Sequence, residues 1–147
     1  MKRSVPDAAC PLCRADRDTV LWSDARCRVV HTGDADYPGL CRVIWNAHVR
    51  EMSDLRDAER RHLMAVVFAL EQTLREVQHP DKINLASLGN QVPHLHWHVI
   101  PRFADDAHFP DPIWAARRRD GARHALDGDA VAAALAQHLG RRASSPS

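Results

Sequence analysis

The amino-acid sequence predicts a single domain in which one long amphipathic helix covers one face of a sheet of short strands. Residues 57–77 place apolar side chains at helical spacing, which is the pattern of a helix that packs on a core through one face. Five shorter apolar runs, bounded by turn residues, have the composition of strands. The length of 147 residues is sufficient to bury one hydrophobic core.

The composition is ordinary for a soluble globular protein except in its histidines. The net charge of +1 gives no electrostatic reason to expect a nucleic-acid polymer or a membrane surface as a partner. No apolar run is long enough to span a bilayer, and no apolar segment of a secretory signal follows the first basic residues. We therefore expect a cytoplasmic protein whose four cysteines are reduced. The ten histidines indicate metal binding or acid–base chemistry.

A flexible leader at residues 1–9 is expected to precede a single domain at 10–140. Its first two strands are predicted at 20–22 and 26–31, joined by a Ser-Asp-Ala turn, and the third at 40–45, after a loop rich in Asp, Gly and Pro. The cysteine in each of the last two strands is expected to pack in the core, because free cysteine is commonly buried.

The helix at 57–77 is expected to begin after an N-cap at Ser53 or Asp54, and a His-Pro-Asp sequence ends it because proline cannot continue a helix. Met64 and Phe68 widen its apolar stripe sideways. This widening indicates either a contact with a partner subunit or a broad core face.

A second helix is predicted at 129–139, capped by Asp127 or Asp129 and closed by Gly140. The polar residues 141–147 are expected to form a disordered tail.

Three histidines recur at every second position of the run 94–100. His94, His96 and His98 alternate with apolar residues, so in a strand the imidazoles line one face and the apolar side chains line the other. Same-face neighbours lie about 6.6 Å apart along a strand, which lets adjacent imidazoles act on one phosphate group or metal ion. The run 83–88 also alternates, and the short turn between the two runs predicts an antiparallel hairpin.

Cys10 and Cys13 form a Cys-Pro-Leu-Cys sequence, which has three interpretations: half of a zinc site, a redox pair, or chance. A thioredoxin-like redox pair follows a strand and opens a helix in a parallel α/β chain, and this sequence lacks that alternation. Half of a zinc site needs two further ligands, which the histidines can supply.

The His-Leu-His-Trp-His-Val-Ile sequence at 94–100 resembles the signature of the histidine triad (HIT) family. Over residues 10–103 other segments resemble the family's first hairpin and its strand followed by a histidine, here His48. Asn84 and the turn at 89–91 stand where the family places a phosphate-contacting asparagine and a glycine-containing loop. The resemblance implies an α+β, HIT-like fold: a five-stranded antiparallel sheet with one long helix between its third and fourth strands, and a C-terminal helix. It also implies a homodimer.

The same resemblance implies a nucleotide hydrolase or transferase that acts at the α-phosphate. His96 would attack the phosphorus and carry a covalent nucleotidyl group, and His98 would hydrogen-bond the phosphate or the departing group. A neutral imidazole suits this task, because its ordinary pKa of about 6.5 leaves it unprotonated near neutral pH. The residues expected to bind the substrate phosphate are Asn84, Gly89, Asn90 and Gln91.

Some HIT proteins, and the related galactose-1-phosphate uridylyltransferases, hold structural zinc on two cysteines, an upstream histidine and the first histidine of the motif. Cys10, Cys13, His48 and His94 resemble this ligand set, and two thiolates with two imidazoles suit tetrahedral zinc. If His94 shares a strand face with His96, it points at the active site. Zinc binding then requires a bulge, or a metal site close beside the catalytic face.

The expected substrate is a dinucleoside polyphosphate or a nucleoside phosphoramidate. Two other functions remain open: a nucleotide-binding regulatory protein with little turnover, and a metallohydrolase that uses the three histidines as a metal triad. Many family members contact the ribose with an acidic residue where this chain has Thr32, so Asp34 or Asp36 is the expected substitute, unless the nucleoside contact differs. Residues 105–114 either fold over the leaving group or form a simple structural crossing.

Overall fold

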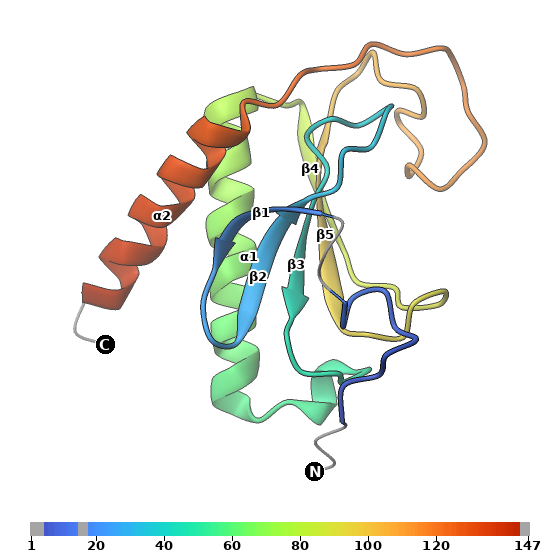
Figure 1. Ribbon diagram of the computed structural model, residues 1–147. Coiled ribbons are helices and arrows are strands. Elements are labelled where there is room, and N and C mark those ends of the chain that lie inside the picture. The colour runs from blue at the N-terminus through green and yellow to red at the C-terminus, as the bar shows by residue number, and fades with distance from the viewer. Residues whose placement is uncertain (1–4, 15–17, 145–147) are drawn as a thin grey trace.

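Five short strands form one antiparallel sheet, and a long helix covers one face of it (Figure 1). The computed structural model describes residues 5–14 and 18–144, the last four of these through their backbone alone. Both the α+β class and the five-stranded antiparallel sheet predicted from the sequence are confirmed. The strands are β1 (Thr19–Ser23), β2 (Cys27–His31), β3 (Cys41–Trp45), β4 (Lys82–Ala86) and β5 (His96–Arg102).

The strand order across the sheet is β1-β2-β3-β5-β4. The predicted hairpin is confirmed, because β4 pairs with β5 in antiparallel register, with Ala86 opposite His98. β5 also pairs with β3, where Arg42 lies opposite His98 and Ile44 lies opposite His96. The strand that carries the histidine motif is therefore an inner strand of the sheet, held on both sides.

β5 begins and ends two residues later than the sequence indicated, and the expectation that Pro101 ends this strand is wrong. The Arg102 carbonyl accepts a hydrogen bond from the Asp81 N–H on the β4 side, so the backbone nitrogen of Pro101 faces the other side. The pairing of β3 with β5 has already ended there, at Val99. Proline's missing N–H therefore interrupts no bond of the ladder.

The long helix α1 (Asp57–Gln78) matches the predicted range, but its predicted start at Ser53 or Asp54 is wrong. Those two residues lie in a short 3₁₀ helix, η1 (Met52–Asp54), and the N-cap of α1 is Arg56. The Arg56 N–H donates to the Glu59 carboxylate at 2.9 Å, which satisfies the N-cap amide as in a capping box. At the other end, His79 ends the helix in the left-handed conformation (φ 52°).

The C-terminal helix, α2 (Gly128–Ser144), packs beside α1 and against β1 (Figure 1). It does not end at Gly140 as predicted, but continues four residues into the segment expected to be a disordered tail. The rest of that tail, 145–147, and residues 1–4 of the predicted leader lie outside the described residues. No helix within the described part of the chain has the length and apolar character needed to cross a membrane.

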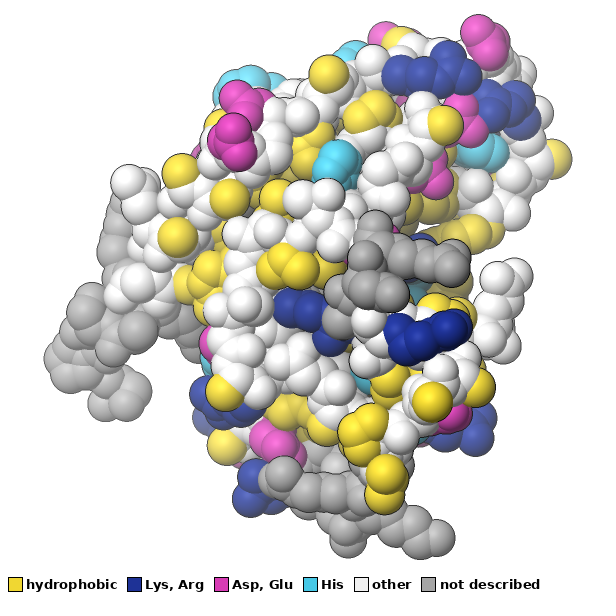
Figure 2. Space-filling model, in the orientation of Figure 1, with side chains coloured by type: hydrophobic (Ala, Val, Ile, Leu, Met, Phe, Trp, Pro, Cys, Tyr) yellow, Lys and Arg dark blue, Asp and Glu magenta, His cyan; other side chains and the backbone are white. Residues whose placement is uncertain are grey.

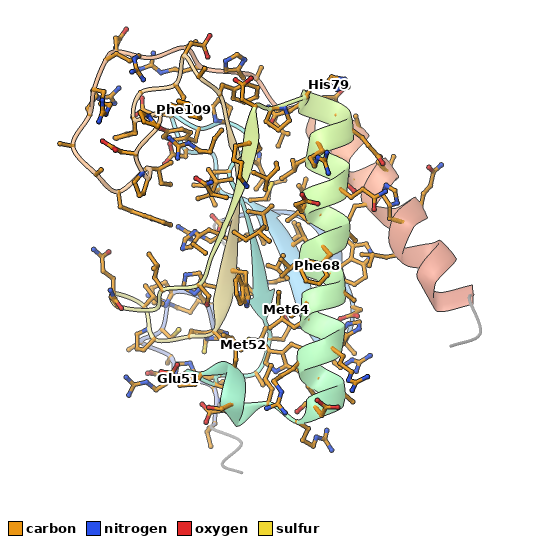
Figure 3. All side chains as sticks on the ribbon, turned by 180° about the vertical axis from the view of Figure 1, so that it is seen from behind. Glu51, Met52, Met64, Phe68, His79 and Phe109 are labelled. Atoms are coloured by element: carbon orange, nitrogen blue, oxygen red, sulfur yellow. The ribbon has the colours of Figure 1, made fainter. Side chains whose placement is uncertain are left out.

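The two faces of the sheet differ in character. The face toward α1 forms the main hydrophobic core, in which Cys27 and Cys41 are fully buried as predicted. Met64 packs against this core, whereas Phe68 is 54% exposed, so the widened stripe of α1 serves the core only in part (Figure 3). The opposite face, called the histidine face below, carries Arg28, Arg42, His96, His98 and Arg102.

Candidate active site and metal centre

The three histidines of the motif do not act on one point in space. His94 precedes the regular part of β5, where the Leu95 N–H donates to the Val49 carbonyl at 2.7 Å. The strand alternation therefore does not fix the direction of the His94 side chain, which is completely buried. His96 and His98 follow in the strand, with their ring centres 4.9 Å apart.

The His94 imidazole lies in a compact cluster of cysteine and histidine side chains. Its Nδ1 is 3.5 Å from the Sγ of Cys10, 3.5 Å from the Sγ of Cys13 and 3.1 Å from Nδ1 of His48. The Cys13 Sγ is in turn 3.3 Å from Nδ1 of His48. All four predicted ligands are brought together, with their ligand atoms within 4.8 Å of one another.

These distances fit a tetrahedral metal centre. Metal–sulfur bonds of about 2.3 Å and metal–nitrogen bonds of about 2.0–2.1 Å place neighbouring ligand atoms of a tetrahedron about 3.3–3.8 Å apart. The Nε2 atom of His94 also lies 2.6 Å from the Trp45 carbonyl. Since a carbonyl oxygen only accepts, Nε2 carries the hydrogen and Nδ1 presents its lone pair to the cluster.

The cluster lies on the histidine face, beside His96 and not behind the sheet. Cys10 and Leu12 pack there against Val30 and Ile44, and Ile44 is the register partner of His96. Of the two geometries that the sequence left open, a bulge or a site close beside the catalytic face, the structure has the second.

His96 is held in one tautomer by its own strand. Its Nδ1 lies 2.6 Å from the carbonyl oxygen of His94, so Nδ1 must carry the hydrogen and donate it. The lone pair is then on Nε2. Burial lowers the pKa of His96 below its ordinary value, with Arg42 adding to the effect, and the neutral form of the ring is favoured.

His98 is also a neutral imidazole. Burial lowers its pKa to about 4, and the neighbouring His96 and Arg42 contribute to the shift. The Nδ1 atom of His98 is buried and has no hydrogen-bond partner among the described residues. Trp114 covers the ring edge-on, with ring centres 5.1 Å apart.

The predicted phosphate contacts occupy different places around these histidines. Asn84 is on the histidine face, and its Oδ1 accepts a 2.9 Å hydrogen bond from Arg102, which leaves its amide NH₂ as a donor. Gly89 adopts a positive φ of 77° and lines a hollow of about 440 Å³ with Ser87 and His96. Asn90 and Gln91 are exposed and do not line that hollow.

The loop between β5 and α2, residues 103–127, forms the other side of the site. Figure 2 shows charged side chains of both signs gathered over this loop, where Asp36 pairs with Arg117 and Arg123. Figure 3 places Phe109 in the loop and Glu51 with Met52 at the opposite end of the sheet. The segment at 105–114 thus reaches the histidine face through Trp114 instead of only crossing it.

A buried network holds this loop to the sheet. Arg102 donates to both carboxylate oxygens of Asp106, at 2.8 and 3.1 Å, and Tyr37 donates its hydroxyl hydrogen to the same carboxylate at 3.2 Å. His108 Nδ1, 2.6 Å from the Tyr37 oxygen, must then be the donor of that bond. Burial alone would raise the pKa of Asp106, but the bonds from Arg102 and from backbone N–H groups hold it well below its usual range.

Sequence reasoning missed one residue at the centre of the site, Arg42. The alternation of 40–45 places this side chain opposite the core-facing Cys41 and Val43, which is a signal that the sequence contains. Its position next to His98, however, depends on the register between β3 and β5.

Comparisons with known proteins identify the family that has this fold and this histidine motif. The HIT domain family model matches residues 14–105, more than half of the chain, and the protein therefore belongs to the HIT family. The structure is similar to that of a histidine triad protein from Bradyrhizobium japonicum, with a TM-score of 0.67, 28% identity, and coverage of 84% of this chain and 91% of that one. A zinc-bound histidine triad family protein from Mycobacterium smegmatis shares the fold, with a TM-score of 0.61, 20% identity, and coverage of 92% and 96%.

Among curated proteins, the AP-4-A phosphorylase of Mycobacterium tuberculosis, in strains CDC 1551 and H37Rv, is 33% identical over 78 residues. The matched segment is 49% of this chain and 40% of the relative. This chain thus spans less than half the length of the curated relatives it matches.

Proposed function

We propose that the protein is a nucleotide hydrolase or transferase that acts at an α-phosphate, with Nε2 of His96 as the nucleophile. The observation that carries the proposal is the 2.6 Å hydrogen bond from His96 Nδ1 to the His94 carbonyl. It leaves the Nε2 lone pair free on a ring that burial keeps neutral. A preorganised neutral imidazole attacks without first losing a proton, and covalent catalysis divides one difficult displacement into two easier ones.

The reaction has two balanced steps. In the first, Nε2 forms a bond to the α-phosphorus while the bond from phosphorus to the leaving group breaks. The leaving group departs with the electron pair and takes up a proton from water. In the second, an acceptor oxygen attacks the phosphorus and gives up its proton to water. The N–P bond breaks, its electron pair returns to Nε2, and His96 is neutral again. With water as the acceptor, the product is a nucleoside monophosphate.

The surrounding groups supply position and hydrogen-bond donors. The buried, unpartnered Nδ1 of His98 is suited to bond the phosphate or the leaving group. The free NH₂ of Asn84 and the backbone around Gly89 are further candidate donors. We retain Asn90 and Gln91 as candidates through their backbone N–H groups, since both side chains are exposed.

The candidate substrates are dinucleoside polyphosphates and nucleoside phosphoramidates. The name of the Mycobacterium tuberculosis relative, AP-4-A phosphorylase, favours the first class and also favours phosphate as an acceptor in place of water. The nucleoside is proposed to lie toward Asp34, because one oxygen of Asp36 pairs with Arg117 and the other with Arg123.

Mass spectrometry of acid-labile adducts tests this function and separates it from a regulatory nucleotide-binding role. Wild-type protein is mixed with a diadenosine polyphosphate or an adenosine phosphoramidate and quenched at high pH. We expect one nucleotidyl group on His96, and a loss of turnover of at least about 10³-fold in His96→Ala, with nucleotide binding retained. Unchanged turnover in that variant would defeat the nucleophile assignment. Binding without an adduct or turnover in the wild type would favour the regulatory role.

We also propose that the Cys10, Cys13, His48 and His94 cluster holds structural zinc. Two observations support this site. The four ligand atoms lie within 4.8 Å of one another, and the Trp45 carbonyl accepts the Nε2 hydrogen of His94, which leaves the Nδ1 lone pair facing the cluster. Four protein ligands leave no open position, so the ion would tie the N-terminal segment to the sheet and take no part in turnover. Turnover that survives complete metal removal in folded protein would contradict a metal-triad hydrolase. Less than a tenth of an equivalent of zinc in purified protein, with both cysteines reactive, would contradict the zinc site.

A homodimer is the proposed assembly. β4 forms one edge of the sheet, and Leu85 on this strand is 37% exposed. Phe68 on α1 is exposed as well (Figure 3). An open sheet edge and exposed large apolar side chains are each typical of an interface. Sedimentation of the wild type and of Phe68→Glu tests this assembly, and a wild-type monomer at micromolar concentration would contradict it.

A further inference from the structure

Arg42 lies at the centre of the histidine face, and no ion pair of its guanidinium group is found among the described residues. It is the register partner of His98, and the side chains of such a pair begin about 4.5–5.5 Å apart. Its Nε atom is buried and has no hydrogen-bond partner within the part of the chain that the structure describes. A buried donor without an acceptor is uncommon in folded proteins, and one beside a candidate active site is available to a ligand.

Two other arginines on the same face donate hydrogen bonds to partners within the protein. Arg28 donates to the Asn46 side chain at 2.9 Å and to the Leu12 carbonyl at 2.5 Å. Arg102 donates to Asp106, to Asn84 and to the Asp111 carbonyl. These two arginines bind partners within the protein. Arg42 differs from them, because its buried Nε–H can still donate to a ligand.

Arg42 and His98 together line a cavity of about 170 Å³. A liquid water molecule occupies about 30 Å³ and ordinary ligand pockets about 300–1,000 Å³, so the cavity suits one small group and not a whole nucleotide. Trp114 and His108 form further walls of it.

Two carboxylates line this cavity, and neither forms an ion pair with Arg42 within the described part of the chain. Asp36 forms ion pairs with Arg117 and Arg123. One oxygen of Asp34 accepts two backbone N–H bonds, from Asp36 at 2.9 Å and from Tyr37 at 3.0 Å. Arg42 therefore has the charge and the donors for an anionic group that enters from outside.

We propose that Arg42 binds a second phosphate group of the substrate, next to the phosphate that His96 attacks. The inference rests on the proposed function and narrows its substrate class. A guanidinium group offers donors in a planar fork that matches the oxygens of a phosphate. Two positions in a nucleotide supply such a group: the next phosphate of a polyphosphate chain, or a phosphate on the ribose. A nucleoside phosphoramidate with an uncharged leaving group supplies neither.

Calorimetric titration with three nucleotides tests the proposal. The probes are AMP, ADP and adenosine 3′,5′-bisphosphate, which differ only in whether and where they carry a second phosphate. We expect the wild type to bind ADP or the bisphosphate at least tenfold more tightly than AMP, and the tighter of the two identifies the source of the group. In Arg42→Gln this preference should fall to less than threefold, with AMP affinity unchanged.

Matched variants complete the experiment. Arg42→Lys, which keeps the charge but loses the fork, should retain part of the preference. Arg75→Gln removes an exposed arginine of α1, on the other side of the sheet, and should leave all three affinities unchanged. Equal binding of the three nucleotides by the wild type would overturn the proposal, as would equal losses for all three in Arg42→Gln.

The outcome for Arg42 is separate from the outcome for His96. An adduct on His96 without a preference for a second phosphate would remove the Arg42 proposal and leave the proposed function. A preference that depends on Arg42, without an adduct, would keep this binding site and remove the catalytic assignment. Absence of binding of all three nucleotides would overturn both.

Discussion

His94 and His96 are joined by a hydrogen bond, yet their imidazoles serve different sites. The Nδ1–H of His96 donates to the His94 carbonyl at 2.6 Å, and the Nδ1 of His94 faces Cys10, Cys13 and His48. The backbone that carries a candidate metal ligand thus also sets the tautomer of the candidate nucleophile. Metal binding and the orientation of His96 are therefore expected to be coupled.

The first prediction concerns removal of the zinc ion that we propose for this cluster. Because zinc would tie the N-terminal segment to the sheet, treatment with a strong chelator should lower the thermal midpoint by at least about 5 °C. Differential scanning fluorimetry measures this shift. Cys13→Ser should have a similarly lowered midpoint and should show no further change with chelator. A wild-type midpoint that chelator leaves unchanged would contradict a stabilising zinc ion in this cluster.

The sequence predicted the elements well because their signals are local. The alternation at 94–98 and the helical spacing of α1 depend on neighbours in the chain, and the structure has a strand and a helix there, although β5 begins only at His96. The errors also have local causes. Pro101 was expected to end a strand, but the adjacent strand had already ended, and Gly140 was expected to close a helix that continues through it.

The site was predictable only in part. The four candidate cysteine and histidine ligands were found from a family resemblance, and the structure brings them together. The place of Arg42 beside His98 depends on the pairing of strands far apart in the chain, and that of Trp114 on the path of an irregular loop. Neither has a local sequence signal.

The lowered pKa of His98 predicts a dependence of stability on pH. The folded value is about 4, whereas unfolded histidine titrates at about 6.5. Between these values the unfolded state binds the proton and the folded state does not, so the free energy of unfolding falls as the pH falls. One such group contributes at most about 1.4 kcal/mol per pH unit, and nothing further is lost below about pH 4.

Urea unfolding at pH 7, 5.5 and 4.5 measures the slope of the free energy of unfolding against pH. His98→Asn should reduce it relative to the wild type, because the titrating group is gone. His79→Asn is the matched control, since His79 is exposed and asparagine tolerates its left-handed backbone (Figure 3). Equal slopes in wild type and His98→Asn would show that His98 does not titrate in this window.

The loop between β5 and α2 folds back on itself at Gly121, and only glycine fits at this position. Its φ is +86°, and a Cβ at this position would lie 2.5 Å from the backbone nitrogen of Ala107. Gly121→Ala should therefore lower the free energy of unfolding by about 2 kcal/mol or more, measured by urea unfolding. Gly140→Ala is the control, because its added Cβ meets no described atom within 4 Å apart from the neighbouring residues and backbone of its own helix, and alanine favours the helix by up to about 1 kcal/mol. Equal effects of the two substitutions would show that the loop does not need the glycine.

The buried Arg102–Asp106 ion pair should contribute far more to stability than an exposed pair. The two side chains are 3% and 1% exposed, and the pair joins β5 to the loop that carries Trp114. Asp106→Asn leaves the buried guanidinium without a compensating charge, so we expect a loss of about 3–5 kcal/mol in the free energy of unfolding. The substitution should also free the loop, and faster hydrogen exchange at residues 103–112 would report that release.

The exposed pair between Arg61 and Asp57 on α1 provides the comparison. Its side chains are 80% and 69% exposed at a separation of 3.0 Å, and solvent screens such a pair. Asp57→Asn should therefore change the free energy of unfolding by less than about 1 kcal/mol and leave exchange in the loop unaffected. If Asp106→Asn were as mild as Asp57→Asn, the buried network would not be what holds the loop against the histidine face.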